Sequence, residues 1–490
     1  MTIISVLKRV IGSIFITGAV LLLVIFFVVA YRAMTYQQVD SQARLQNKYE
    51  YLEGIANSAQ NPDRPNIIFV LYDDMGYGDI GAGAVNNTQV STPNIDQLAS
   101  SGIMLSNFYS PAPVCTPSRA GFLTGRLPPR AGIPYVVFPS GSVSQMVNST
   151  VTRPTENIRL PAEEITIANI LSAAGYATKM VGKWHLGDRS PSLPNDMGFD
   201  QYYGALYSND MQPFAFYRNK NIEVQAPVDQ TRMTALYTSE AVEFITDNAG
   251  ASFFLYFAHN FPHDPLSASE ERSGKSDAGL YGDVLEEIDD SIGAIVSALE
   301  KTNTLDNTLI IISSDNGPWF LGNAGHQRGR KGNTFEGGMR VPFIAHWPAK
   351  IPAGNIVSSM AMGTDLLPTL LELLRLPAPT DRILDGKSIA EVLTQAAPSP
   401  HQYLYYFDGN TLFATRDSSF KYRRSAAVHY GTDEMPFYFP IPQKEWLFDL
   451  RNNNAESYDV SGRYPQVLTE LKAALQKKEK ELEDNLRGWL

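Results

Sequence analysis

The chain has 490 residues, of which 44% are hydrophobic and 19% are charged, so it can bury a sizeable core and is not a disordered polyelectrolyte. It has 40 Lys and Arg residues against 51 Asp and Glu residues, a net charge of −11. This balance argues against a dedicated nucleic-acid-binding protein, whose surface is basic. Cys115 is the single cysteine, which excludes an intramolecular disulfide and a zinc site built from several thiolates.

An uncharged apolar stretch over residues 10–30 is long enough to cross a bilayer as a helix. An uncleaved anchor suits its length, and the sequence VVA at residues 28–30 leaves a cleavable signal peptide as the alternative. Both interpretations place the remaining chain outside the cytoplasm, in the periplasm or at the cell surface. We therefore expect an anchor or signal segment over residues 1–32 and a polar linker, partly helical, over residues 33–63.

Four apolar runs rich in branched and aromatic residues predict buried strands, and helical patterns lie between them. This alternation predicts an α/β domain over residues 64–400, with a large, mainly parallel or mixed sheet flanked by helices. Short aromatic runs and a charged amphipathic segment predict a smaller C-terminal subdomain over residues 401–490, with an antiparallel sheet and a helix. The predicted strands of the large domain are 66–72, 178–181, 253–258 and 309–314, and the predicted helices are 163–174, 234–247 and 281–299.

Polar residues follow each of the four predicted strands. In parallel sheets, ligands bind at the carboxyl ends of the strands, so we expect these residues to meet at one edge. Carboxylate and amide oxygens suit a hard cation such as Ca²⁺ or Mg²⁺, although a single acidic pair is more often a solvated loop or a helix cap. The residues concerned are Asp73 and Asp74, Asp315 and Asn316, Lys183 and His185, and His259 and His263.

Cys115 lies in the sequence CTPSR at residues 115–119. Pro117 suits the first position of a helix, which would place Cys115 at a helix N-terminus, where backbone N–H groups favour anions. From the residues alone, Cys115 is a thiol nucleophile or simply a packed residue.

The CTPSR sequence and the trailing LTG at residues 123–125 resemble the C-x-P-x-R signature of type I sulfatases. A second sulfatase signature is similar to GYATKMVGKWH at residues 175–185. Further matches are DDMGYGD, TPNID and EGGMRVP, and YSND at residues 207–210 resembles arylsulfatase A and its bacterial relatives. The resemblance implies an alkaline phosphatase-like fold and an arylsulfatase-like sulfuric ester hydrolase.

The resemblance also implies that a maturation enzyme oxidises Cys115 to Cα-formylglycine. Its hydrated form, a geminal diol, would attack a sulfate monoester and form a covalent sulfate ester as the alcohol leaves. The second hydroxyl would then expel sulfate, a route closed to an unmodified thiol. The expected substrates are aryl or carbohydrate sulfates.

The resemblance assigns a role to each matching residue. Asp73, Asp74, Asp315, Asn316 and the modified Cys115 would hold the cation, expected to be Ca²⁺ with Mg²⁺ possible. Arg119 would brace the diol and the carboxylates. Lys183 and His185 would contact the diol and the sulfate, and His263 and Lys331 would bind sulfate and assist the leaving oxygen. Ser208 would be an accessory hydrogen-bond donor, and His326 is a candidate for the substrate pocket.

Two other functions compete with this interpretation. One is a phosphate or phosphonate monoester hydrolase of the same superfamily, which would more often carry a Ser or Thr nucleophile and two metals. The other is a non-catalytic, membrane-tethered sulfate-binding module. The sequence leaves the natural ester open, and its net acidity is only weak evidence against long polyanionic substrates.

Overall fold

The four apolar runs form neighbouring strands at the centre of a ten-stranded sheet. They pair in parallel in the order β9-β1-β8-β4. Every residue of β1, β8 and β9 is buried, because helices cover both faces of the sheet, and this explains their continuous apolar sequences. The bounds are β1 (Asn66–Tyr72), β4 (Ala177–Gly182), β8 (Phe253–Ala258) and β9 (Thr308–Ser314).

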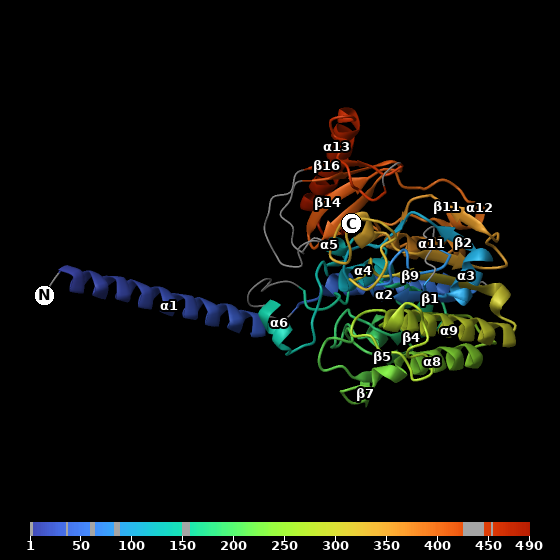
Figure 1. The fold of residues 1–490 in the computed structure, drawn as a ribbon. Coiled ribbons are helices and arrows are strands. Elements are labelled where there is room, and N and C mark those ends of the chain that lie inside the picture. Colours follow the sequence, from blue (N-terminus) through green and yellow to red (C-terminus); the bar gives the residue numbers. More distant parts are fainter. Residues whose placement is uncertain are drawn as a thin grey trace.

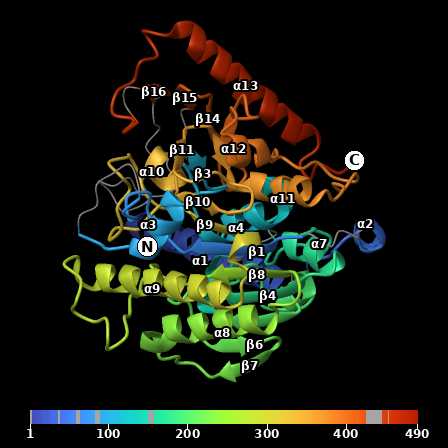
Figure 2. The ribbon, with the colours of Figure 1, turned by 90° about the vertical axis from the view of Figure 1, so that its right-hand side faces the viewer.

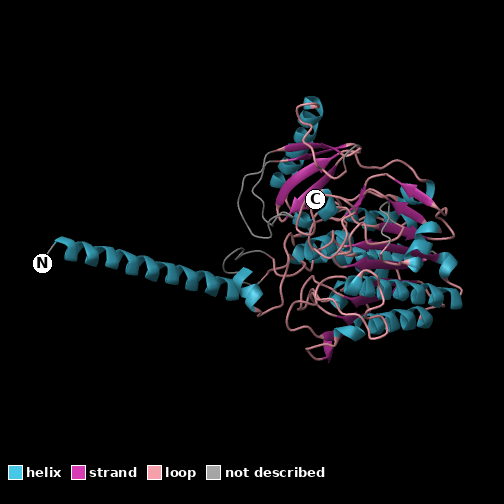
Figure 3. Ribbon diagram, viewed as in Figure 1, coloured by secondary structure: helices cyan, strands magenta, loops and turns pink. Residues whose placement is uncertain are grey.

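The sheet is completed on both sides by shorter strands, several of them antiparallel. The computed structural model describes residues 3–35, 38–58, 64–82, 89–148, 157–424, 445–451 and 454–490. The mixed sheet lies between layers of helices (Figure 3). Beyond β4 lie β5 (Gln201–Gly204), β6 (Phe216–Arg218) and β7 (Asn221–Val224), and beyond β9 lie β10 (Phe343–His346), β2 (Ile103–Leu105) and β11 (Asn355–Val357), while β3 (Phe108–Tyr109) and β12 (Ala361–Met362) pair separately.

Each face of the sheet carries its own core. Alternate residues of β1 belong to different clusters, as the two-residue period of a strand requires: Ile67 and Phe69 pack on one side, and Ile68 and Val70 on the other. Helices α8 and α9 lie on one side of the sheet, and α4, α7 and α11 on the other (Figure 2). The bounds are α4 (Cys115–Thr124), α7 (Ile167–Ala173), α8 (Met233–Asp247), α9 (Gly279–Lys301) and α11 (Leu366–Leu374), with the shorter α3 (Pro93–Ser100), α5 (Pro128–Ala131), α6 (Val143–Val147), α10 (Glu336–Met339) and α12 (Ala390–Gln395).

The helices begin one to four residues from the expected starts, and two of these shifts have a clear cause. Helix α7 begins at Ile167 rather than at residue 163, because Thr166 and Asn169 form a capping box. Helix α4 begins at Cys115, two residues before Pro117. Proline is tolerated in this first turn because its missing N–H has no intrahelical partner there.

The N-terminal apolar stretch is helix α1 (Ile3–Thr35), which extends away from the main body (Figure 1). Among the described residues it is the one helix long and apolar enough to cross a membrane, with a mean hydropathy of 2.8 over Ile11–Val28. The segment expected to be a linker contains α2 (Gln42–Ser58), which packs onto the main body. The buried Lys48 Nζ donates to the carbonyl oxygens of Ala162 (2.9 Å) and Glu164 (2.7 Å).

The C-terminal aromatic runs form a four-stranded antiparallel sheet in the order β13-β14-β15-β16, and α13 packs against β14 and β15. Its core also includes Tyr109, Met339 and Met362 from the larger part of the chain, so the two parts share one apolar cluster. The bounds are β13 (Leu404–Asp408), β14 (Thr411–Arg416), β15 (Phe420–Arg423), β16 (Trp446–Asp449) and α13 (Pro465–Asp484).

Candidate active site

Three carboxylates converge at the carboxyl ends of β1 and β9. Asp73 and Asp74 follow β1, and Asp315 follows β9. The two strands pair in register up to their last residues, so their following residues meet. One oxygen of each carboxylate and the Sγ of Cys115 form a group of atoms that all lie within 4.8 Å of one another.

Asn316 completes an oxygen-rich group beside these carboxylates. Its side-chain Nδ2 donates to Asp74 Oδ1 (2.7 Å), while its Oδ1 is buried without a hydrogen-bond partner. Burying such an oxygen costs free energy unless a hydrogen-bond donor or a cation contacts it. The donor set therefore fits a hard divalent cation, Ca²⁺ or Mg²⁺, better than a soft metal.

The backbone after β1 is held in an unusual conformation that turns Asp74 toward the site. Asp74 has a φ of +66°, a region that Asp tolerates better than most residues. Its N–H donates to Asp315 Oδ1 (3.2 Å), and the next N–H, of Met75, donates to Ser314 Oγ (2.9 Å). The β9 terminus thus fixes the turn after β1.

Helix α4 brings Cys115 and Arg119 to the same place, one turn apart. The thiol of Cys115 donates to Asp73 Oδ1 (3.3 Å). Arg119 is fully buried, and its Nε donates to Asp315 Oδ2 (2.9 Å) while Nη1 donates to the carbonyl of Lys183 (2.7 Å). The guanidinium therefore links the helix to the ends of β9 and β4.

Asp73 and Asp74 each contact a different lysine. Lys183, after β4, places its Nζ on Asp73 Oδ2 and donates to Ser208 Oγ (3.2 Å). Lys331 comes from a distant loop, and its Nζ lies 2.8 Å from Asp74 Oδ2. Both lysines expected from the sequence are thus brought to the carboxylates.

The histidines differ in how closely they join this group. The Nε2 of His263 lies 3.8 Å from Asp74 Oδ2, and its Nδ1 is 2.5 Å from the carbonyl oxygen of Asp264. His185 lies at the end of β4 with Nε2 3.0 Å from the carbonyl oxygen of Val137. His259 is buried and accepts a hydrogen bond from the Phe261 N–H.

The close carboxylates perturb one another's protonation. Burial and then the neighbouring Asp73 carboxylate raise the pKa of Asp315 to about 7. Burial would also raise the pKa of Asp73, but Lys183, His263 and Arg119 outweigh it and hold that pKa well below its usual value. Burial, followed by Asp73, raises the pKa of the Cys115 thiol. Such opposed shifts among clustered groups are typical of functional sites.

A cavity of about 600 Å³ opens from this group to the surface. Four of its lining residues, Asp210, Asp264, Pro265 and Trp319, were not assigned a role from the sequence. The position of Trp319, three residues after Asn316, is the signal that could have identified it. His326 is exposed and does not line this cavity. The lining residues are Asp74, Asp210, His263, Asp264, Pro265, Trp319 and Lys331.

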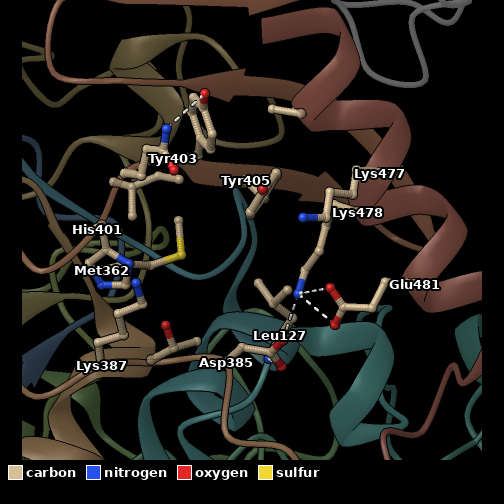
Figure 4. Close-up of a pocket in the computed structure, with 14 residues that line it drawn as sticks. Leu127, Met362, Asp385, Lys387, His401, Tyr403, Tyr405, Lys477, Lys478 and Glu481 are labelled. Carbon is tan, nitrogen blue, oxygen red and sulfur yellow. Dashed lines mark hydrogen bonds and ion pairs between the residues drawn. The ribbon is translucent and has the colours of Figure 1, made fainter. Parts of the chain in front are cut away.

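A second cavity, of about 320 Å³, lies between the main body and the C-terminal subdomain (Figure 4). It shares no lining residue with the first. Its two acids are paired with a lysine, since Lys478 contacts Asp385 and Glu481, and its His401 contacts the buried Asp365 (2.8 Å). The described residues that could hold a metal gather at the sheet edge, not here.

Comparison with known families gives a direct match over most of the chain. Residues 65–376 match the family described as Sulfatase. Residues 326–483 match the C-terminal region of N-sulphoglucosamine sulphohydrolase. The chain belongs to the sulfatase family. It is an arylsulfatase-like sulfuric ester hydrolase, as its resemblance to type I sulfatases predicted.

Individual sulfatases support the same assignment. N-acetylgalactosamine-6-sulfatase from Mus musculus is 36% identical over 387 residues, covering 74% of this chain and 72% of that protein. Arylsulfatase A from Homo sapiens is 33% identical over 457 residues, covering 83% and 86%. Among solved structures, the sulfatase PsFucS1 from Pseudoalteromonas sp. has a TM-score of 0.76 at 27% identity, covering 91% and 95%.

The expected alkaline phosphatase-like fold is confirmed by these sulfatase structures. A phosphonate monoester hydrolase from Agrobacterium radiobacter also shares the fold, with a TM-score of 0.58 over 85% of this chain and 96% of that one. Its identity of 18% makes this a likeness of fold alone.

Proposed function

We propose that this sulfatase hydrolyses sulfate monoesters of aryl or carbohydrate alcohols, using formylglycine made from Cys115 and a Ca²⁺ ion, with Mg²⁺ as the alternative. The observation that carries the proposal is the place of Cys115. It lies at the first position of α4, with its Sγ inside the group formed by Asp73, Asp74 and Asp315. The proposed cation ligands are Asp73, Asp74, Asp315, Asn316 and the modified Cys115.

Residue 115 and the cation would each supply one kind of chemistry. Cys115, once converted to hydrated formylglycine, would supply a hydroxyl as nucleophile and a second hydroxyl that allows sulfate release. The bound cation would polarise a sulfate oxygen. The chain's own task is to hold the sulfate dianion, orient it for in-line attack and assist the departure of the alcohol.

The two lysines are placed to receive the charge of the sulfate group. Lys183 and Lys331 approach the carboxylate pair from opposite elements, after β4 and before α10. Each side chain ends in a nitrogen with several N–H donors, which favours an anion between them. We assign both to sulfate binding, with His185, after β4, and Ser208, after β5, as further contacts. Arg119 positions the carboxylates and residue 115.

His263 is assigned to the leaving oxygen. Its Nδ1 faces the Asp264 carbonyl (2.5 Å), and a carbonyl only accepts, so Nδ1 carries a hydrogen. Nε2 is then the atom that takes up or gives a proton, and it points toward Asp74 at the cavity. Burial, then Lys331, lowers the pKa of His263, which makes the protonated ring a better donor. Lys331 supplies a second N–H donor nearby.

The deciding experiment is mass spectrometry of the peptide that contains Cys115, taken from protein produced with a formylglycine-generating enzyme. The aldehyde mass should be present, and hydrolysis of nitrophenyl sulfate should rise with the fraction converted. A Cys115→Ala variant from the same host should bind the cation more weakly and lose turnover. Full activity in protein whose Cys115 is an intact thiol would overturn the mechanism.

The partners and location follow from the same proposal. Residues 1–32 are proposed to anchor the protein or to act as a signal segment, with residues 64–400 as catalytic domain and 401–490 as C-terminal subdomain outside the cytoplasm. Exposed helix α1 supports this. In bacterial spheroplasts, external protease should reach the globular part, and alkaline extraction should separate an anchored chain from a cleaved one. Protection from protease would contradict the location.

The rival hydrolase functions are separated by substrate. Within the described residues, the candidate metal groups overlap in Asp73 and Cys115, which favours one metal over the two expected of a phosphatase. Turnover of nitrophenyl phosphate above that of nitrophenyl sulfate would favour the phosphatase alternative. Sulfate binding without any turnover after metal and formylglycine are supplied would favour the binding module.

A further inference from the structure

The outer wall of the sheet-edge cavity differs in character from its floor. The floor holds Lys331, assigned above to sulfate, and His263, assigned above to the leaving oxygen. The outer lining includes an aromatic ring, Trp319, and two acids, Asp210 and Asp264, beside Pro265. Trp319 keeps 44% of its surface exposed, and the adjacent Phe320 and Leu321 are exposed as well. Contiguous exposed apolar side chains of this kind are typical of binding sites.

Trp319 is fixed on the rim by its own backbone. It lies in the turn 317–322, directly after the proposed cation ligands. The carbonyl oxygen of Trp319 accepts from Arg330 Nη1 (2.9 Å), and the Lys331 N–H donates to the carbonyl of Pro318 (3.0 Å). The Trp319 ring also packs edge-to-face on Phe320, with centroids 4.6 Å apart. The indole is therefore held beside the sulfate-binding lysine.

The two acids lie on turns that are fastened to each other. Asn209 Nδ2 donates to the carbonyl oxygens of Pro265 (2.9 Å) and His263 (3.2 Å). This contact ties the turn carrying Asp210 to the turn carrying Asp264. The backbone that carries both acids is therefore held together at the rim, and Asp210 is exposed to solvent.

The aromatic ring and the two acids of the rim would determine which alcohol, the part of the substrate bonded to the sulfate, can bind. The C–H face of a sugar ring packs on an indole, and sugar hydroxyls donate hydrogen bonds to carboxylates. A second sulfate or a uronic acid would instead meet like charge, which is unfavourable at close range.

We propose that Trp319, Asp210 and Asp264 form the leaving-group subsite, and that it takes an uncharged hexose or N-acetylhexosamine ring carrying one sulfate, in preference to polyanionic units. This inference rests on the proposed sulfatase function, and it identifies the substrate class of that same site.

The test measures sulfate release, as kcat/KM, from galactose and N-acetylgalactosamine monosulfated at the 3-, 4- or 6-position, from a disulfated galactose and from nitrophenyl sulfate. Wild-type protein should prefer at least one monosulfated sugar to the disulfated one. Turnover of nitrophenyl sulfate with none of the monosulfated sugars would overturn the subsite and leave the proposed function standing. Absence of aryl sulfate turnover would instead count against the proposed function.

Trp319→Ala should lower kcat/KM for the preferred sugar about tenfold, mainly through KM, as expected for a lost stacking surface. Inhibition by inorganic sulfate should be unchanged, because its contacts lie on the floor of the cavity. Leu321→Ala is the matched control, since Leu321 is exposed in the same turn but does not line the cavity. Equal losses in the two variants would refute a role for Trp319.

Asp210→Asn removes one charge from the rim at nearly constant size. The ratio of kcat/KM for disulfated to monosulfated galactose should rise about fivefold, as for a contact between two like charges about 4 Å apart in water, and less at high salt. Glu270→Gln is the control, because Glu270 is exposed and outside the lining. An unchanged ratio in Asp210→Asn would overturn the charge selection.

Discussion

The two cavities contain similar residue types and differ in how the charges are arranged. Both present lysine, aspartate and histidine side chains. In the cavity at the subdomain boundary, the acids Asp385 and Glu481 both contact Lys478 (Figure 4), and the lining residue His401 contacts the buried Asp365. At the sheet edge each carboxylate also has a cationic neighbour, but the three carboxylates and the Cys115 sulfur converge on one point.

The difference shows what separates a structural polar cluster from a reactive one. Paired charges satisfy each other and stabilise the packing of two parts of the chain. At the sheet edge, burial and then repulsion from the Asp73 carboxylate raise the pKa of Asp315 to about 7. A group of converging carboxylates gains stability when a cation joins it. The residue types alone do not distinguish the two cavities. The convergence of several carboxylates on one point does.

The largest expected effect is at the sheet edge. Asp315→Asn removes one of the three carboxylates with little change in size. Turnover of nitrophenyl sulfate should fall on the order of 100- to 1,000-fold, the usual cost of losing a preorganised electrostatic group, and calcium retained per chain should fall in elemental analysis.

Asp385→Asn tests the same change in the other cavity. Its carboxylate contacts Arg130, Lys478 and the Leu127 N–H, so turnover per folded molecule should stay within about twofold of wild type. Equal losses of activity in the two variants would remove the contrast between the cavities.

The next effect concerns the leaving group. His263→Ala should reduce kcat/KM for sugar sulfates about 100-fold more than for nitrophenyl sulfate, because a basic sugar alkoxide needs a proton and a nitrophenolate does not. Stopped assays with both substrates at several pH values measure the two losses. If they are equal, His263 binds sulfate only, and the proton comes from Lys331 or water.

The boundary cavity should respond in stability rather than activity. His401→Ala leaves the buried Asp365 carboxylate without its histidine and should lower the free energy of unfolding by about 1–3 kcal/mol, with turnover per folded molecule unchanged. Lys477→Ala, at an exposed position of the same lining, should change stability by less than about 0.5 kcal/mol. Denaturant titration compares the variants, and a loss of turnover in His401→Ala would refute a purely structural role.

The smallest effect concerns Asp79, which accepts a hydrogen bond from the Asn323 N–H just after the turn that carries Trp319. Burial raises the pKa of Asp79 to about 6, although Tyr281 and the Asn323 N–H donate hydrogen bonds that oppose the rise. The folded state therefore binds the Asp79 proton more tightly than the unfolded chain, whose carboxyl has a pKa near 3.8. The stability from this group is full below about pH 4 and is lost as pH rises through about 6.

Asp79→Asn should therefore flatten the decline of Tm between about pH 4 and pH 6 relative to wild type. The exposed Asp277→Asn is the control and should leave the slope unchanged. A wild-type slope in Asp79→Asn would show that Asp79 does not hold its proton in the folded protein.

The N-terminal region shows where sequence reasoning was incomplete. The polar segment over residues 33–63 was expected to be a linker, helical in part, and its helix α2 is instead packed on the main body through Lys48 and the buried Ile55. The polar sequence of α2 has no strong periodic pattern from which its docking could be predicted. The hydrogen bonds of Lys48 that hold it join the helix to carbonyl groups more than 100 residues away.

The sequence by itself determined the parallel core and the polar residues at its edge. A strand buried on both faces must be apolar throughout, and the first residues after it carry whatever polar chemistry the edge has. Asp73, Asp315 and Lys183 could therefore be predicted to meet from local patterns alone, and the motif around Cys115 added the family.

Only the tertiary structure decided the pairings within that set. Lys183 contacts Asp73 from 110 residues away, and Lys331 contacts Asp74 from 257 residues away. The tertiary structure also placed Trp319 on the rim of the sheet-edge cavity and brought each acid of the boundary cavity into contact with a cationic side chain. Local propensity acts between neighbours in the chain, whereas these contacts depend on strand register, helix packing and loop closure, which bring together residues that share no sequence pattern.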